Sequence, residues 1–244
     1  MNSIFKRLLS KKGVSLVELI VVMAITSVIL LIATSMLAPA NNLMNSIKGN
    51  AHLDTLCDTA NEYIRGALQT AVSISVYKYD SSTLNDIEIQ ADNYIKSGLK
   101  TKALAVIEIP VETDASGNQI KAFRLFDFTT IIDKTTLMND LSIADIYKNG
   151  AFLEPFYEKT SFSVKISTPT NDTGASSWIK LKSRCYNIYS GDQNNQEKTM
   201  TFKCLNGNTG IDTGSTVQGD GTDEPYEGSF VILYTVKDFS SIKT

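Results

Sequence analysis

Residues 11–38 decide the fold of this chain, and they read KKGVSLVELIVVMAITSVILLIATSMLA. Within them, residues 19–38 carry no charge, no proline and no glycine. A helix of about 20 residues spans roughly 30 Å, which is the thickness of the hydrocarbon layer of a bilayer. The core helix of a soluble protein rarely runs so far without a charge. This stretch therefore predicts a membrane-spanning helix.

The residues before the apolar stretch are basic and include no acid: Lys6, Arg7, Lys11 and Lys12. Positive charge holds a short N-terminal segment in the cytoplasm, so we expect the rest of the chain on the outer side of the membrane. A cleaved secretory signal peptide is the alternative, and residues 35–40 (SMLAPA) offer a weak cleavage site for one. The apolar run is longer than such a peptide needs.

Glu18 stands inside what is otherwise a continuous apolar run from Val14. A charged side chain at the centre of a membrane helix costs about 2.5 to 3.5 kcal/mol, so Glu18 needs a partner. Cleavage after Gly13 would place a new amine at Val14, one helical turn away, where the helix dipole also favours an anion. Amine and carboxylate can then neutralise each other, within one subunit or between neighbours. The alternative is that Glu18 sits at the membrane interface of an uncut chain.

Residues 11–19 (KKGVSLVEL), followed by the apolar helix, resemble the N-terminal signature of type IV prepilins and pseudopilins. In that family a membrane-embedded aspartyl peptidase, the prepilin peptidase, cuts after the Gly and methylates the new amine. The Glu pairs with the amine of a neighbouring subunit during assembly. The resemblance implies that Gly13 is the cleavage residue, Val14 the methylated terminus and Glu18 the assembly residue. Val14 departs from the usual Phe or Met, and the resemblance covers only about the first 38 residues.

The apolar stretch and the resemblance together predict three segments. Residues 1–13 form a basic leader that is removed, residues 14–38 a transmembrane and assembly helix, and residues 39–244 an extracytoplasmic domain. Pro39 predicts a kink or a break in the helix. An amphipathic helix then resumes, because its apolar residues share one arc. They are Leu53, Leu56, Cys57, Ala60, Ile64, Ala67, Leu68 and Ala71.

The remainder of the chain predicts one more helix and several strands. The helix covers residues 84–97, with Ser82 or Thr83 as its cap and Gly98 at its end. Residues 137–150 are ambiguous. The strands are 103–109, 120–126, 162–166, 178–189, 200–205 and 230–236, and short connections favour antiparallel hairpins. The fold class is therefore α+β, a long N-terminal helix packed against an antiparallel β-sheet, as in pilins.

Cys185 and Cys204 flank a predicted hairpin, and they face each other directly if its turn is centred on residues 194–195. A disulfide between them is chemically possible outside the cytoplasm. The alternatives are buried thiols or a different pairing that involves Cys57.

Other ligand-binding patterns are weak. Residues 206–228 hold six glycines and five acids, a composition able to bind calcium, but no EF-hand pattern is present. A zinc set of Cys57, Cys185, Cys204 and His52 matches no motif spacing, so we expect no metal and no cofactor. A basic stripe on one strand (Lys180, Lys182 and Arg184) indicates a solvated face rather than a nucleic-acid site, because the chain is acidic, with a net charge of -3.

No Ser-His-Asp set, phosphate-binding loop or dinucleotide motif is present, so we expect no enzyme. The resemblance implies a structural subunit of a type IV pilus or related filament, and the size of the chain favours a minor pilin. Its partners are the prepilin peptidase, other pilin subunits, the assembly machinery and, before assembly, the membrane. The precursor spans the cytoplasmic membrane once with its N-terminus inside, and the product is a cell-surface filament. Alternatives are a pseudopilin of a type II secretion or DNA-uptake machine, or a single-pass anchored binding module that never polymerises.

Overall fold

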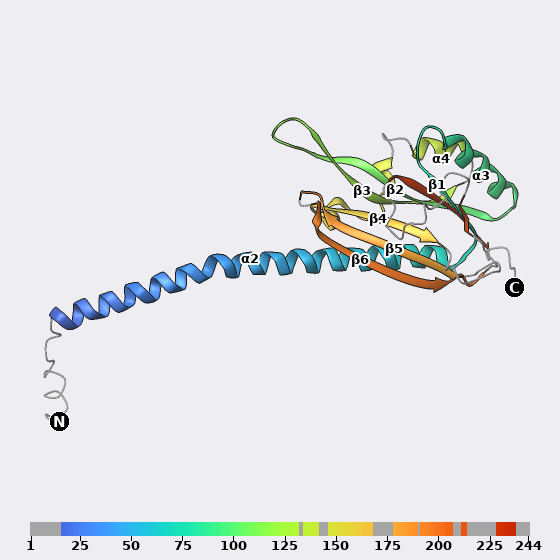
Figure 1. Ribbon diagram of the computed structural model, residues 1–244. Helices are drawn as coiled ribbons and strands as arrows, with labels where there is room; N and C mark the ends of the chain where they lie inside the picture. Colours follow the sequence, from blue (N-terminus) through green and yellow to red (C-terminus); the bar gives the residue numbers. More distant parts are fainter. Residues whose placement is uncertain are drawn as a thin grey trace, which may run out of the picture. The chain divides into compact units, whose positions relative to one another are not determined.

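The computed structural model describes residues 16–131, 134–141, 146–167, 178–189, 191–206, 211–213 and 228–237. The chain divides into two compact units, Met1–Gly49 and Asn50–Thr244. Helix α2 (Leu16–Gln69) contributes its first part to one unit and its last part to the other (Figure 1).

Helix α2 continues through Pro39, so the predicted break at this residue is wrong. Proline removes one backbone hydrogen bond and costs about 3 kcal/mol in a helix interior. Ending the helix here would require a second, costly nucleation event only a few residues later. Good helix formers on both sides, Leu37, Ala38 and Ala40, favour continuation.

The larger sheet, sheet A, has five strands in the order β3-β2-β8-β1-β7. They are β1 (Ala71–Lys78), β2 (Lys100–Thr113), β3 (Gln119–Ile131), β7 (Ile211–Thr213) and β8 (Phe230–Val236). The pairs are antiparallel except for β1 with β7, which is parallel. Strand β8 lies between β2 and β1, so the C-terminal part of the chain completes the centre of this sheet.

The smaller sheet, sheet B, consists of β4 (Thr160–Ser167), β5 (Trp178–Asn187) and β6 (Gly191–Lys203). The strands pair in chain order and are antiparallel, which confirms the predicted hairpins.

Helix α3 (Leu84–Lys96) confirms the predicted second helix, and Gly98 follows it with a positive φ of 75°. The predicted side-chain cap is wrong in its detail. Thr83 occupies the N-cap position, but its hydroxyl donates to the carbonyl of Lys78 instead of accepting from the helix. Three short helical segments complete the domain: α4 (Lys134–Asp140), η1 (Ile146–Asn149) and α5 (Glu154–Tyr157).

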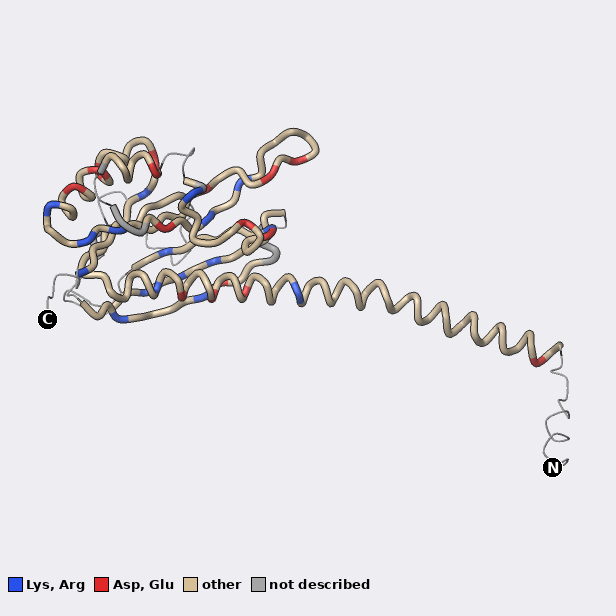
Figure 2. Tube along the Cα trace, turned by 180° about the vertical axis from the view of Figure 1, so that it is seen from behind, with Lys and Arg blue, Asp and Glu red and all other residues tan. Residues whose placement is uncertain are grey.

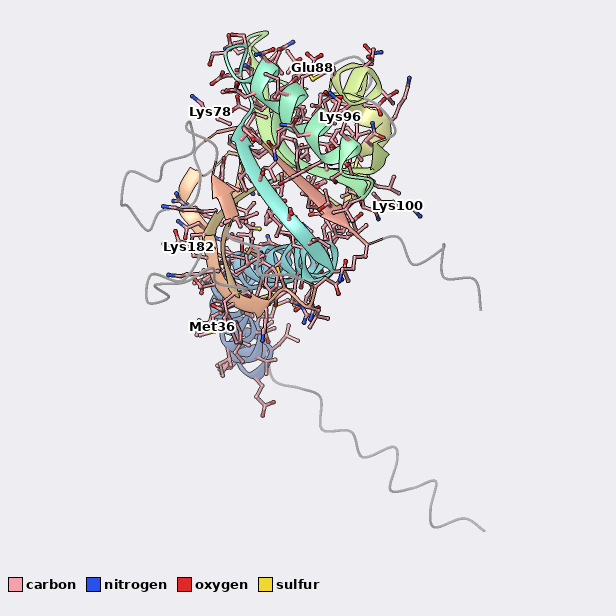
Figure 3. The ribbon with its side chains drawn as sticks, turned by 90° about the vertical axis from the view of Figure 1, so that its right-hand side faces the viewer. Met36, Lys78, Glu88, Lys96, Lys100 and Lys182 are labelled. Carbon is pink, nitrogen blue, oxygen red and sulfur yellow. The ribbon has the colours of Figure 1, made fainter. Side chains whose placement is uncertain are left out.

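Two apolar cores organise the domain in layers (Figures 1 and 3). In the first core, the last part of α2 packs against sheet A and against sheet B. In the second core, the opposite face of sheet A packs against α3 and α4. Strand β8 shows the division, because Ile232 and Tyr234 belong to the first core and Val231 and Leu233 to the second. The structure therefore has the predicted α+β, pilin-like arrangement.

Two strands of sheet A were not predicted. Ala71 fits the apolar arc of the helix, yet α2 ends at Gln69 and Ala71 begins β1. Residues 72–76 (VSISV) do alternate as a strand, but they follow the helix directly, and the prediction continued the helical arc through Ala71 instead. Strand β7 is only three residues long and forms by pairing with distant β1.

Burial of α2 by the two sheets predicts the effect of shortening a side chain there. Leu56 is fully buried, so Leu56→Ala is expected to lower the free energy of unfolding by about 2 to 5 kcal/mol. Leu153, which is 81% exposed, provides the matched control, and Leu153→Ala is expected to cost little. Urea unfolding of the full chain in detergent, followed by circular dichroism, measures both. Equal effects of the two substitutions would contradict this packing.

Candidate assembly helix and its anchorage

The first part of α2 presents an apolar surface to its surroundings. Every described side chain from residue 16 to residue 49 is exposed, including Leu16 at 74% and Leu31 at 71%. No charged residue lies between Glu18 and Lys48, and this part of the helix is tan throughout in Figure 2. Among the described residues, α2 is the one helix whose length and composition allow it to cross a membrane. An apolar surface this large requires lipid or protein to cover it.

The hydroxyl groups of residues 19–38 are satisfied inside the helix. Thr26, Ser27, Thr34 and Ser35 each donate a hydrogen bond of 2.7 to 2.9 Å to a backbone carbonyl three or four residues earlier. Such bonds remove the cost of placing a hydroxyl in hydrocarbon. This part of the helix is therefore apolar in effect as well as in composition.

Glu18 lies in the first turn of α2 and is exposed. A carboxylate in this position interacts favourably with the positive end of the helix dipole. The predicted cleavage residue Gly13 and the predicted terminus Val14 lie outside the described residues. The pairing of Glu18 with an amine at Val14 therefore stays a prediction.

Beyond residue 49 the surface of the same helix changes. The buried residues of α2 follow the predicted stripe, and Ala67 is partly buried beside them. They are Leu53, Leu56, Cys57, Ala60, Ile64 and Leu68, together with Asn61, which the apolar pattern did not include. The period of 3.6 residues keeps them on faces that meet sheets A and B. The helix is thus apolar on all sides at first and amphipathic afterwards.

A three-residue ion cluster holds α2 to sheet B. Lys198 of β6 places its Nζ 2.7 Å from Asp54 Oδ1 and 2.5 Å from Asp58 Oδ2. The two carboxylates are four residues apart and share one side of the helix. Desolvation lowers the pKa of Lys198, but its hydrogen bonds to both aspartates outweigh this effect and raise it above the usual value. Sequence analysis missed the cluster, because Lys198 and the two aspartates lie far apart in the sequence and meet only in the fold.

The C-terminal end of α2 is capped by the segment that follows β6. The amide of Leu205 donates to the carbonyl of Gln69 at 2.8 Å, and Asn206 Nδ2 donates to the carbonyl of Thr70 at 2.8 Å. The last carbonyls of a helix have no partner within it, so these bonds stabilise the helix end. On the other side, the hydroxyl of Tyr63 donates to the Asp127 carboxylate of β3, which ties the helix to sheet A.

The cysteines do not occupy the predicted register. Strand β5 pairs Cys185 with Gln196, and Asn187 pairs with Gly191, so the hairpin turns earlier than residues 194–195. Cys204 follows the end of β6, and its thiol donates to the carbonyl of Leu68 at 3.4 Å. The predicted register is wrong, and the proposed Cys185–Cys204 bridge loses its geometric basis. Asn194 and Asn195, chosen for the turn, lie inside β6.

The other predicted ligand sites receive no support from the described residues. Within them, no group of three or more His, Cys, Asp or Glu side chains is placed to hold a metal ion. Most of the proposed calcium loop, residues 206–228, lies outside the described residues. The basic stripe lies on the face of sheet B away from α2 (Figure 3). On that face, Glu197 Oε1 lies 3.7 Å from Arg184 Nε and Glu197 Oε2 lies 3.9 Å from Lys182 Nζ. The carboxylate therefore offsets part of the positive charge of the stripe.

Comparison with known proteins matches the N-terminal part of the chain to a family model. Residues 8–34 match the family model described as the prokaryotic N-terminal methylation motif, which is the prepilin-type cleavage and methylation signature. No curated protein and no solved structure matches the chain. The N-terminal part of the chain thus carries a signature similar to that of type IV pilins and pseudopilins, and this motif implies processing by a prepilin peptidase.

The Lys198 cluster predicts a pH-dependent contribution to stability. Lys198→Met is expected to lower the free energy of unfolding by about 1 kcal/mol at neutral pH, because each carboxylate is about half exposed. The folded-state pKa of Lys198 is raised, so its contribution is complete below the unfolded value near 10.5 and is lost as the pH rises through the folded value. Urea unfolding at pH 7 and at pH 11 measures this change. Lys96→Met, which removes an exposed pair with Asp92 on α3, is the control and is expected to cost less. The prediction would be contradicted if Lys198→Met lowered the free energy of unfolding by the same amount at both pH values.

Proposed function

We propose that this protein is a minor pilin, a structural and non-enzymatic subunit of a type IV pilus. A prepilin peptidase removes residues 1–13 and methylates Val14. Residues 14–38 hold the subunit in the cytoplasmic membrane and later enter the core of the filament, while residues 39–244 form the domain at the cell surface. One observation carries the proposal. The methylation signature leads directly into a helix that is exposed and uncharged between Glu18 and Lys48.

The proposed change of environment is compatible with the helix surface. In the membrane, lipid covers residues 16–38, and in a filament the same side chains pack against neighbouring helices. Lipid tails are about as apolar as leucine, so this exchange is driven by packing and by specific polar contacts. Satisfied hydroxyls and the absence of charge from residue 19 to residue 47 allow the helix to move between the two environments without desolvating an ion.

Glu18 supplies the specific polar contact. A carboxylate within an apolar bundle is stable only with a cation beside it. The amine created at Val14 of a neighbouring subunit is that cation in our proposal. An apolar helix alone can slide against its neighbours, whereas one charge pair fixes both the register and the direction of addition.

We assign the chain to a minor subunit because the segment after the apolar helix, residues 39–244, is large and contains two sheets. A pseudopilin of a secretion or DNA-uptake machine uses the same processing and the same Glu18. The two roles differ in where the protein is recovered. A minor pilin is found in filaments sheared from the cell surface, and a pseudopilin stays with the cell envelope.

Processing is tested at Gly13. Gly13→Ala is expected to abolish cleavage, because the peptidase recognises the residue before the cut, and the protein then keeps its leader on a gel. In the wild type, mass spectrometry is expected to find N-methylated Val14 as the first residue. Gly49→Ala is the matched control, since nothing lies within 4 Å of a Cβ atom added at Gly49. A wild-type protein that retains Met1 would instead indicate an anchored module that does not polymerise.

Assembly is tested at Glu18. Glu18→Ala is expected to leave cleavage largely intact and to reduce incorporation into filaments at least tenfold, since a lost charge pair of about 1.4 kcal/mol is a factor of ten in an equilibrium constant. Immunoblots that compare sheared filaments with the membrane fraction measure incorporation. Glu62→Ala removes the other glutamate of α2, which pairs with Arg65 on the exposed side of the domain, and is expected to assemble normally. Normal incorporation of Glu18→Ala would refute the assigned role.

A further inference from the structure

Two buried cysteines from distant parts of the chain meet at the contact between α2 and sheet B. Cys57 of α2 and Cys185 of β5 are both 0% exposed. The sulfur of Cys57 lies 3.3 Å from Ser183 Oγ and 3.7 Å from the carbonyl oxygen of Gln196. Ser183 stands two residues before Cys185 on the same buried face of β5, and Gln196 is the direct cross-strand partner of Cys185. Cys57 therefore points at the part of sheet B that carries Cys185.

The third cysteine is separate from this pair. Cys204 contacts the carbonyl of Leu68, which lies 11 residues after Cys57 and hence about 16 Å further along the helix. A disulfide needs its two Cα atoms within about 7 Å of each other. The fold therefore selects one pair out of the three possible pairings.

The pKa values of the two thiols shift in opposite directions in the closed domain. The hydrogen bond from Cys185, assisted by Ser183, lowers the pKa of Cys57 despite its burial. Burial, and then the hydrogen bond to Cys57, raises the pKa of Cys185. These directions belong to the closed domain, and before it closes either cysteine can start the exchange as its thiolate, which is the reacting form.

We propose that a disulfide joins Cys57 to Cys185 in the exported protein and fastens α2 to sheet B, while Cys204 stays a thiol. The inference rests on the proposed function, which places the domain outside the cytoplasm, where disulfides form and persist. The oxidant is a disulfide donor, either an extracytoplasmic thiol oxidoreductase or a small-molecule disulfide.

The exchange balances in two steps. The Cys57 thiolate attacks one sulfur of the donor disulfide, which gives a mixed disulfide and releases one donor thiolate. The Cys185 thiolate then attacks the Cys57 sulfur of the mixed disulfide, so the Cys57–Cys185 bond forms and the second donor thiolate leaves. The donor is reduced to two thiols, which take up the two protons lost by the cysteines. Both sulfurs are inaccessible in the folded domain, so the exchange occurs while sheet B closes on the helix.

The pairing is tested by refolding the full chain in detergent with a mixture of oxidised and reduced glutathione, then alkylating it under denaturing conditions. Trypsin places each cysteine in a different peptide: residues 49–65, 185–198 and 204–237. We expect a linked pair of the first two peptides and an alkylated third. Linkage of peptide 204–237, or alkylation of all three cysteines, would overturn the proposal. This readout does not depend on processing or filament assembly, so its failure is distinct from a failure of the proposed function.

Variants provide a second measurement. A disulfide that closes so long a loop is expected to raise Tm by roughly 5 to 15 °C in a domain of this size. Reductant should therefore lower the Tm of the wild type and of the control Cys204→Ser by that amount. It should leave the Tm of Cys57→Ser and Cys185→Ser unchanged. A reductant effect that persists in Cys57→Ser or disappears in Cys204→Ser would refute the assignment.

Discussion

The burial of residues 53–68 of α2 between two sheets is the interaction on which the rest of the domain depends. Sheet A covers the helix with residues such as Ile74 and Ile232, and sheet B covers it with residues such as Phe162 and Leu181. The two sheets also contact each other directly, since Phe123 and Arg124 of β3 donate hydrogen bonds to Ser161 and Thr160 of β4, and the helix helps to fill the apolar core that their inner faces share. The same helix carries the exposed apolar surface of residues 16–49, so one element provides both the centre of the fold and the surface that we propose for assembly.

The connectivity of the domain sets the order in which this burial can be completed. The helix comes first in the chain, whereas β8, at the centre of sheet A, comes last. The residues that cap the helix end, Leu205 and Asn206, also come late. Long-range pairings of this kind form slowly, because a large loop must close before each contact is made. An apolar helix that is synthesised early can therefore enter the membrane before the domain folds around its other part.

The sequence predicted the features that depend on local periodicity and missed those that depend on distant partners. The buried stripe of α2 and the hairpins of sheet B follow from spacing alone, and both are present. Strand β1 was missed because Ala71 continues the helical arc, and β7 because three residues have no pattern of their own. The turn of the β5–β6 hairpin was misplaced, since Asn194 and Asn195 have turn chemistry but lie within β6. Lys198, which meets two aspartates about 140 residues earlier, is visible only once the fold is known.

The charges of the first 50 residues argue for a link between cleavage and assembly. In the uncut chain, Lys11 and Lys12 lie close to Glu18 in sequence and can offset its charge. The proposed removal of residues 1–13 would take these cations away, and Lys48 would then be the first basic side chain in the chain. Lys48 lies about 45 Å along the helix from Glu18, which exceeds the thickness of the hydrocarbon layer. The new amine is therefore the only nearby cation that the shortened chain itself can supply. In the proposed function, cleavage of the leader therefore both removes the cations near Glu18 and creates the amine that pairs with it, so the proposal predicts that an uncut subunit does not join a filament.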